Sequence, residues 1–284
     1  MRCAWQEYLH IIPHWMRSEV DKQGRDSLQE LRLRIGKCPE LVFQTRNEKL
    51  NKTVTREDID FVINIASSFS PWTASTIADG FITSQGGHRI GICGACVIKN
   101  GTVCGISHPN SLCIRVARDF DRIAETAANR SGSILILGPP GSGKTTLLRD
   151  LIRCKSNIGT GSIAVVDERQ ELFPIIKGQA CFPAGDRTDI LSGVPKANGV
   201  EMVLRSMSPE WIAVDEITAS EDCEVLLHAG WCGVNLIATA HAGSVQDLRT
   251  RPVYQPLVKY GLFSNIIVLQ KDKSWKIERM NLCH

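Results

Sequence analysis

Short runs of alternating hydrophobic and polar residues in the first third of the chain predict a mixed α/β region. Leucines and isoleucine alternate with arginines over residues 31–35, which predicts a half-buried strand, and residues 41–43 are expected to return beside it. Thr55 followed by Asp58 resembles a capping box, so a helix is predicted to begin here and to bury the apolar residues spaced along 59–66.

A hairpin is predicted farther along the same region. Asn100-Gly101 is the residue pair that a tight two-residue turn favours, because both positions adopt positive φ. Strands are expected at 89–92 and 95–98 before this turn and at 102–106 after it.

The pattern changes after residue 118. Residues 119–130 are expected to form a connecting helix, and short, unbroken apolar strands then alternate with helices. The expected strands are 133–137, 162–166, 211–214 and 234–239, the expected helices are 144–154, 200–207 and 221–229, and a terminal hairpin is expected over 266–269 and 275–277. Apolar strands separated by helices are typical of a parallel sheet covered on both faces.

The predicted fold class is therefore α/β, with a RecA-like P-loop core and parallel sheet preceded by a smaller mixed α/β domain. The predicted organisation is an N-terminal α/β domain over 1–112, a linker and connecting helix over 113–130, and an ATPase domain over 131–284.

Composition narrows the class of protein. The 284 residues carry 33 Lys and Arg against 30 Asp and Glu, and the charge is balanced in both halves. Binding to nucleic acid driven by charge is therefore not supported.

No apolar run approaches the ~18 residues of a membrane span, and the first residues lack the apolar core of a signal peptide. The 11 cysteines are accordingly expected to be reduced thiols in the cytoplasm.

The strongest motif matches the phosphate-binding pattern G-x-x-x-x-G-K-[ST]. It lies between a predicted strand and an amphipathic helix, which is the context that a phosphate-binding loop requires. The expected nucleotide-binding residues are Gly138, Pro139, Pro140, Gly141, Ser142, Gly143, Lys144, Thr145 and Thr146. Glycines let backbone amides surround a polyphosphate, Lys144 reaches the β- and γ-phosphates, and Thr145 offers its hydroxyl to Mg²⁺. The expected ligands are thus ATP and Mg²⁺.

An apolar strand that ends in two carboxylates supplies the second signal. Asp215 is expected to hold Mg²⁺ together with Thr145, and Glu216 to accept a proton from the attacking water. An acidic residue adjacent to Asp215 favours hydrolysis of the nucleotide.

Two more predicted strands end in polar residues. Asp167 and Glu168 follow one of them, and His241 follows another. Ligands of parallel sheets bind beyond the carboxyl ends of the strands, so these side chains are expected to converge with Asp215 and Glu216 on one crevice.

Residues 185–196 and 204–217 resemble stage III sporulation protein AA, a family of endospore-forming bacteria that is similar to the type II and type IV secretion and pilus ATPases. The resemblance extends over nearly the whole chain and includes residues 31–36, 86–91 and 114–118.

The resemblance implies further functional assignments. Residues 166–172 match the Asp box of secretion ATPases and 238–243 their His box, which implies active-site roles for Glu168 and His241. It also implies a homo-oligomeric ring, a hexamer, with ATP between neighbouring subunits. The implied partners are the membrane channel proteins of the sporulation complex between mother cell and forespore. The implied location is cytoplasmic and peripheral to the membrane on the mother-cell side, and no nucleic acid partner is expected.

Hydrolysis also requires a cation near the γ-phosphate beyond Lys144. The candidates are Arg89, Arg115, Arg118 and Arg205. Arg115 and Arg118 lie at the predicted domain junction, where a neighbouring subunit could reach them, and are the preferred catalytic candidates. Surface solvation is the alternative for each of the four arginines.

A C-x-x-C pair in the predicted hairpin leaves three interpretations open: a metal site, a redox pair and small apolar packing residues. Cys93 and Cys96, with Cys104 and Cys113 downstream, begin like a metal knuckle but lack a second C-x-x-C. On a regular strand Cys93 and Cys96 face opposite sides, and only a turn at Gly94 would bring them together. Small apolar packing residues are the favoured interpretation.

Two other functions remain open at this point. A RecA-like core also serves nucleic-acid motors, and a nucleotide can be a structural ligand in an assembly scaffold without catalysis. The balanced charge disfavours the first alternative, and the pairing of a complete loop with Asp215-Glu216 disfavours the second.

Overall fold

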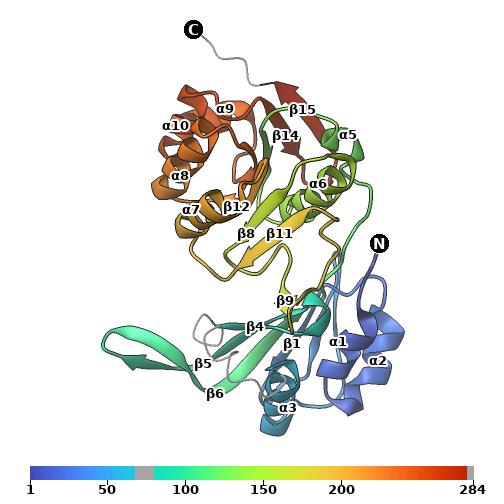
Figure 1. Ribbon diagram of the computed structural model, residues 1–284. Coiled ribbons are helices and arrows are strands. Elements are labelled where there is room, and N and C mark those ends of the chain that lie inside the picture. Colours follow the sequence, from blue (N-terminus) through green and yellow to red (C-terminus); the bar gives the residue numbers. More distant parts are fainter. Residues whose placement is uncertain (68–79, 280–284) are drawn as a thin grey trace. The chain divides into compact units, whose positions relative to one another are not determined.

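The structure is a computed structural model that describes residues 1–67 and 80–279. The chain divides into two compact units, Met1–Asp119 and Phe120–His284, each of which is described by itself (Figure 1).

The N-terminal unit contains a six-stranded antiparallel sheet in the order β3-β2-β1-β6-β5-β4. Its strands are β1 (Glu30–Arg34), β2 (Glu40–Val42), β3 (Asn47–Lys49), β4 (Phe81–Thr83), β5 (Arg89–Lys99) and β6 (Thr102–Arg115). Its helices are α1 (Trp5–Ile11), α2 (His14–Gly24), α3 (Arg56–Ser67) and the short 3-10 helix η2 (Gln85–Gly87).

Two local predictions for this unit are confirmed. Leu31 and Leu33 are fully buried on β1 while the intervening arginine is partly exposed, as the alternation predicts. The capping box closes α3: the Thr55 hydroxyl accepts a hydrogen bond from the Asp58 amide at 3.3 Å, and the Asp58 carboxylate accepts one from the Thr55 amide at 2.9 Å.

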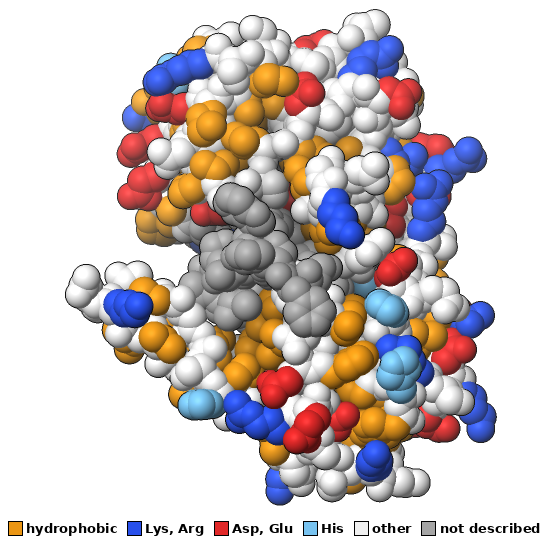
Figure 2. All heavy atoms as spheres, turned by 60° about the horizontal axis from the view of Figure 1, so that its bottom comes forward, with side chains coloured by type: hydrophobic (Ala, Val, Ile, Leu, Met, Phe, Trp, Pro, Cys, Tyr) orange, Lys and Arg blue, Asp and Glu red, His pale blue; other side chains and the backbone are white. Residues whose placement is uncertain are grey.

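The predicted hairpin is also confirmed, and it is longer than expected. Asn100 (φ 52°) and Gly101 (φ 77°) form its turn. Strand β4 pairs with β5 only up to Gly91, and β1 pairs with β6 only from Ser111 onward. Residues 94–110 therefore continue beyond the sheet as a two-stranded ribbon, on which Figure 2 shows hydrophobic side chains and no acidic ones.

The cysteines of this ribbon do not form a knuckle. Strand β5 continues through Gly94 with bulges rather than a turn. Cys93, Cys96 and Cys104 are exposed free thiols, so the favoured interpretation of these three as buried packing residues is wrong. In the described part of the chain, no group of three or more His, Cys, Asp or Glu side chains could hold a metal ion.

His88 forms hydrogen bonds to residues near both the beginning and the end of the N-terminal unit. Its buried ring donates from Nε2 to the Ala4 carbonyl at 2.9 Å and accepts at Nδ1 from the Ala117 amide at 3.1 Å. Burial lowers the pKa of His88 to about 4, so the ring is neutral at pH 7.

The predicted connection over 113–130 requires correction. Strand β6 continues to Arg115, and instead of a helix over 119–130 the chain forms only the four-residue helix α5 (Glu125–Ala128). The reason is the buried carboxylate of Asp150, which accepts the amides of Arg122 and Ala124 at 3.2 and 2.9 Å and holds this segment outside a helix.

The C-terminal unit contains a seven-stranded sheet in the order β11-β8-β12-β13-β7-β14-β15, parallel except for β15. Its strands are β7 (Ile134–Leu137), β8 (Ile163–Asp167), β11 (Thr188–Ser192), β12 (Trp211–Ile217), β13 (Asn235–Ala240), β14 (Asn265–Leu269) and β15 (Trp275–Arg279). A small separate hairpin is formed by β9 (Ile175–Ile176) and β10 (Gln179–Ala180).

Helices cover both faces of this sheet, with α7 and α8 on one face and α6 on the other (Figure 1). The helices after α5 are α6 (Lys144–Ile158), α7 (Lys196–Met207), α8 (Ser220–Trp231), α9 (Val245–Thr250), η3 (Pro252–Tyr254) and α10 (Gln255–Lys259). The predicted parallel α/β architecture is confirmed, and strand β11 is an addition to it. In the described residues, no helix is long and apolar enough to cross a bilayer.

Candidate functional site

The glycine-rich segment forms a loop between the end of β7 and the start of α6. Gly141 (φ 73°) and Gly143 (φ 100°) adopt backbone conformations that a side chain would strain. A Cβ atom on Gly138 would lie 2.6 Å from the Ser142 hydroxyl oxygen. The loop is therefore shaped by its glycines, and it ends at a helix N-terminus, which attracts anions.

Lys144 lies inside this loop and is 7% exposed. Its ammonium donates hydrogen bonds to the Gly138 carbonyl at 2.9 Å, the Pro139 carbonyl at 3.1 Å and His241 Nδ1 at 3.0 Å. Burial lowers its pKa, whereas the carboxylates of Glu216 and Asp215 act in the opposite direction. The ammonium thus lies where phosphate oxygens would replace the loop carbonyls as its partners.

An orphaned polar atom also fits a phosphate ligand in this loop. Ser142 is 2% exposed, and its hydroxyl oxygen has no hydrogen-bond partner among the residues that the structure describes. A buried hydroxyl without a partner costs free energy, which a phosphate oxygen would recover.

The side chains of Thr145 and Asp215, the two expected Mg²⁺ ligands, are in contact beside the loop. The Thr145 hydroxyl donates to Asp215 Oδ2 at 3.1 Å, and the Thr239 hydroxyl donates to Asp215 Oδ1 at 2.8 Å. Strand β13 lies between β7 and β12, so all three residues reach the same edge of the parallel sheet. One hydroxyl and one carboxylate are a ligand set that suits Mg²⁺ when phosphates and water complete its coordination.

Glu216 and His241 are in direct contact. His241 Nε2 lies 2.8 Å from Glu216 Oε1, while Nδ1 of the same ring faces the ammonium of Lys144. Because an ammonium can only donate, Nδ1 accepts, and the ring proton on Nε2 is directed at the glutamate. The imidazole therefore bridges the phosphate-loop lysine and the carboxylate that ends β12.

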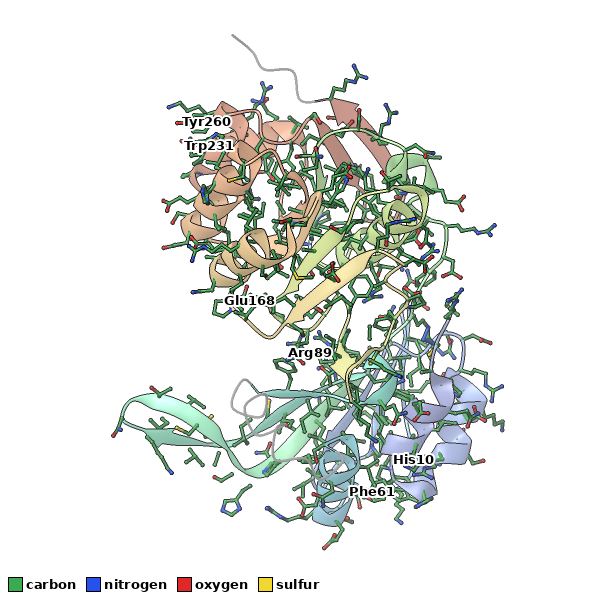
Figure 3. All side chains as sticks on the ribbon, viewed as in Figure 1. His10, Phe61, Arg89, Glu168, Trp231 and Tyr260 are labelled. Carbon is green, nitrogen blue, oxygen red and sulfur yellow. The ribbon has the colours of Figure 1, made fainter. Side chains whose placement is uncertain are left out.

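The predicted convergence of strand ends is present in the structure. Asp167, Glu168, Asp215 and Glu216 line one pocket, and Lys196 contributes to its wall. Figure 3 labels Glu168, which lies just beyond the end of β8.

Asp167 has a structural task at this end of the sheet. Its carboxylate accepts the backbone amides of Glu171, Leu172 and Phe173 at 2.9, 3.1 and 2.8 Å, which fixes the loop after β8. Burial raises its pKa to about 6.

A second pocket, of about 350 Å³, borders the loop on its other side. Aromatic and aliphatic side chains, including Phe120, Ile123, Leu147 and Trp275, line it together with the backbone of the phosphate loop. Sequence reasoning missed this pocket because Phe120 and Trp275 lie at opposite ends of the unit's sequence. Ser142, Gly143 and Thr146 in its lining belong to the predicted nucleotide-binding set.

Three of the four candidate arginines belong to the N-terminal unit, and Arg205 lies on α7 of the C-terminal unit. Arg115 pairs with Glu30 at 3.3 Å, Arg118 donates to the Arg25 carbonyl at 3.0 Å, and both belong to the N-terminal unit. Arg89 lies over the Phe81 ring in the same unit, whereas the exposed Arg205 pairs with Glu201 on α7. Contact of Arg115 or Arg118 with a nucleotide on another copy stays a prediction.

Comparison with solved structures shows which fold the chain shares. The structure of the pilus retraction motor PilT with bound ADP is similar at a TM-score of 0.61 and 15% identity, covering 93% of this chain and 82% of that one. The ATPase DotB of Legionella pneumophila is similar at a TM-score of 0.57 and 16% identity, covering 94% and 80%. The fold is thus that of the secretion and pilus ATPases.

The sequence identifies a narrower family than the secretion and pilus ATPases that share the fold. The model of the family "Sporulation stage III, protein AA" matches residues 6–278, and the chain belongs to that family. Stage III sporulation protein AA of Bacillus subtilis (strain 168) is 36% identical over 280 residues, which cover 94% of this chain and 91% of that protein.

Proposed function

We propose that the chain is a Mg²⁺-dependent ATPase whose active site is built around Lys144, Thr145, Asp215, Glu216 and His241. The observation that carries the proposal is the hydrogen-bonded series from Lys144 through His241 to Glu216, next to the Thr145–Asp215 pair. It joins a phosphate-binding group to a carboxylate that can accept a proton, and it does so beside a magnesium ligand set.

The reaction would be an in-line attack of water on the γ-phosphorus. The water oxygen forms the new bond, the bond to the β,γ-bridging oxygen breaks, and ADP leaves with that electron pair while Glu216 accepts the proton of the water. Lys144 and the loop amides bind the β- and γ-phosphates, and His241 orients Glu216 through the 2.8 Å contact. Bound Mg²⁺, held by Thr145 and Asp215, would supply positive charge to the phosphate oxygens. Glu168 is a further carboxylate that lines the same pocket.

The base of the nucleotide is assigned to the pocket of Phe120, Ile123, Leu147 and Trp275. This pocket shares Gly143 and Thr146 with the phosphate loop, so one ligand can occupy both. Its aromatic side chains suit stacking against a planar base.

The assembly and cellular role are proposed from the family and the fold class. The chain would form a ring, a hexamer, in which Arg115 or Arg118 of a neighbouring copy supplies the remaining cation for the γ-phosphate. The ring would act at the mother-cell side of the membrane and energise the channel proteins of the sporulation complex. The family membership and the likeness to PilT and DotB support this role.

The test is phosphate release by the purified chain with Mg·ATP, measured with and without single- and double-stranded DNA. The proposal expects magnesium-dependent turnover that Lys144→Ala abolishes and DNA leaves unchanged. Strong, salt-sensitive stimulation by DNA would indicate a nucleic-acid motor instead. Tight ATP binding without turnover would indicate a scaffold in which the nucleotide is a structural ligand.

A further inference from the structure

We infer that Lys196 is a positioning residue that fixes the main chain of Glu216 so that its carboxylate is held for proton transfer. The inference rests on the hydrolase proposal above and adds to it a residue outside the phosphate loop and outside the acidic strand end.

The contacts of Lys196 carry the inference. Its ammonium donates to the carbonyl oxygen of Glu216 at 2.7 Å and to Asp222 Oδ2 at 3.2 Å, and it lies 3.5 Å from Glu168 Oε2. An ammonium has three donors, and the three oxygens around Lys196 match them in number. The Lys196 side chain thereby contacts the proposed base Glu216, the Glu168 carboxylate after β8 and the Asp222 carboxylate in the first turn of α8.

Because the Lys196 side chain is buried, its ammonium depends on the oxygens around it. The side chain of Lys196 is 5% exposed and that of Asp222 is 10% exposed, whereas that of Glu168 is 40% exposed. A buried cation is stable only when anionic or carbonyl oxygens replace its water, so the ammonium is tied to the Glu216 carbonyl and to Asp222. Its contact with Glu168 is the more solvated one and contributes less.

The close packing of α7 on β8 places the lysine. A Cβ atom on Gly199 would lie 2.5 Å from a methyl group of Val166, so the helix approaches the strand more closely than any other residue would allow. Lys196 is the first residue of α7. The ammonium therefore enters the pocket wall from a helix that cannot move toward solvent without losing this contact.

The segment after Glu216 is fixed by further contacts in the same region. The Asp222 carboxylate accepts the amides of Thr218 and Ala219 at 2.9 and 3.2 Å, and the Tyr254 hydroxyl donates to the Ile217 carbonyl at 3.1 Å. With the Lys196 contact, consecutive residues of the turn are held from 216 to 219. On the other side, the Glu216 carboxylate contacts His241, so the proposed base is held at both its main chain and its side chain.

The test is steady-state ATP hydrolysis and equilibrium binding of a fluorescent ATP analogue by Lys196→Met. This variant removes the donors and the charge but keeps a long apolar stem. Because a misplacement of about 1 Å costs about 10²-fold in rate, we expect kcat to fall at least about tenfold while the Kd for the analogue stays within about twofold. Lys196→Arg, which keeps a cation and donors, is expected to recover part of the lost kcat. Lys259→Met on the exposed end of α10 is the matched control and is expected to keep both values.

Each outcome of the Lys196→Met experiment either supports or overturns the inference. A Lys196→Met variant with wild-type kcat overturns it, and so does an equal loss of kcat and nucleotide affinity, which would mean a collapse of the site. If thermal melting shows that Lys196→Met does not fold, the same kcat and Kd measurements are made on Asp222→Asn. A lower kcat with unchanged Kd then supports the inference, and a wild-type kcat overturns it. A wild-type chain without turnover refutes the hydrolase proposal and this inference together, whereas an active wild type and an equally active Lys196→Met refute this inference alone.

Discussion

Replacing Glu216 by Gln tests which group accepts the proton of the attacking water. The amide is nearly isosteric with the carboxylate, and its oxygen can still accept the hydrogen bond from His241 Nε2, which spans 2.8 Å in the native site. The pocket, the phosphate loop and the Thr145–Asp215 pair are therefore expected to stay in place, while the change removes the negative charge of the carboxylate and with it the ability to accept a proton. General base catalysis contributes about 10²–10⁴-fold, so kcat should fall by that factor, equivalent to about 3–5 kcal/mol of barrier.

The assay is single-turnover hydrolysis of ATP with enzyme in excess, together with nucleotide binding by the same protein. Glu168→Gln is the matched control, because it neutralises another glutamate of the same pocket and should cost less than Glu216→Gln. Unchanged nucleotide affinity with slow cleavage fits the assignment. A Glu216→Gln protein that cleaves at the wild-type rate, or a Glu168→Gln protein with the larger loss, would refute the assignment of Glu216 as the base.

Three further predictions concern the base pocket, the N-terminal unit and the loop backbone. Trp275→Ala should raise the Kd for ATP by fivefold or more, because stacking on a base is worth about 1–3 kcal/mol, and it should leave kcat near the wild-type value; equilibrium titration with a fluorescent analogue measures this. His88 has a folded-state pKa of about 4 against an unfolded value of 6.5, so the unfolded chain binds more protons between these values and stability falls as the pH drops from 6.5 to 4, by up to about 3 kcal/mol; urea unfolding at pH 7.5 and 5 should show a smaller pH dependence for His88→Asn. Gly143→Ala introduces a side chain at φ 100° and should lower the free energy of unfolding by about 1–2 kcal/mol, and an unchanged melting curve would contradict the loop geometry.

Much of the C-terminal fold is predictable because its local signals agree with each other. The strand before the phosphate loop is apolar at every position, and the helix after it has one apolar stripe, so periodicity identifies both. Apolar periodicity predicts helix α7 only from residue 200, but the helix begins at Lys196, because the polar and small residues of its first turn carry no such periodicity. Strand β11 was missed because it is a short edge strand with polar residues on both sides of Ile190 and Leu191.

The candidate site is predictable only where one motif contains its residues. The loop at 138–146 is one continuous segment, and the acidic pair at 215–216 is another. The two segments lie together in the structure, where Thr145 contacts Asp215. The contacts of Lys196 and Thr239 depend on strand order, which brings β8 and β13 to either side of β12. No spacing in the sequence encodes that order, so neither residue could have been chosen from its neighbours.

The most direct test of the central claim is magnesium-dependent release of phosphate from ATP by the purified wild-type chain beside Lys144→Ala. The claim predicts turnover by the wild type that stops on chelation of Mg²⁺, and neither turnover nor nucleotide binding by the variant. A wild-type chain that neither binds nor cleaves ATP at millimolar concentration, or a Lys144→Ala variant that cleaves it equally fast, would contradict the claim.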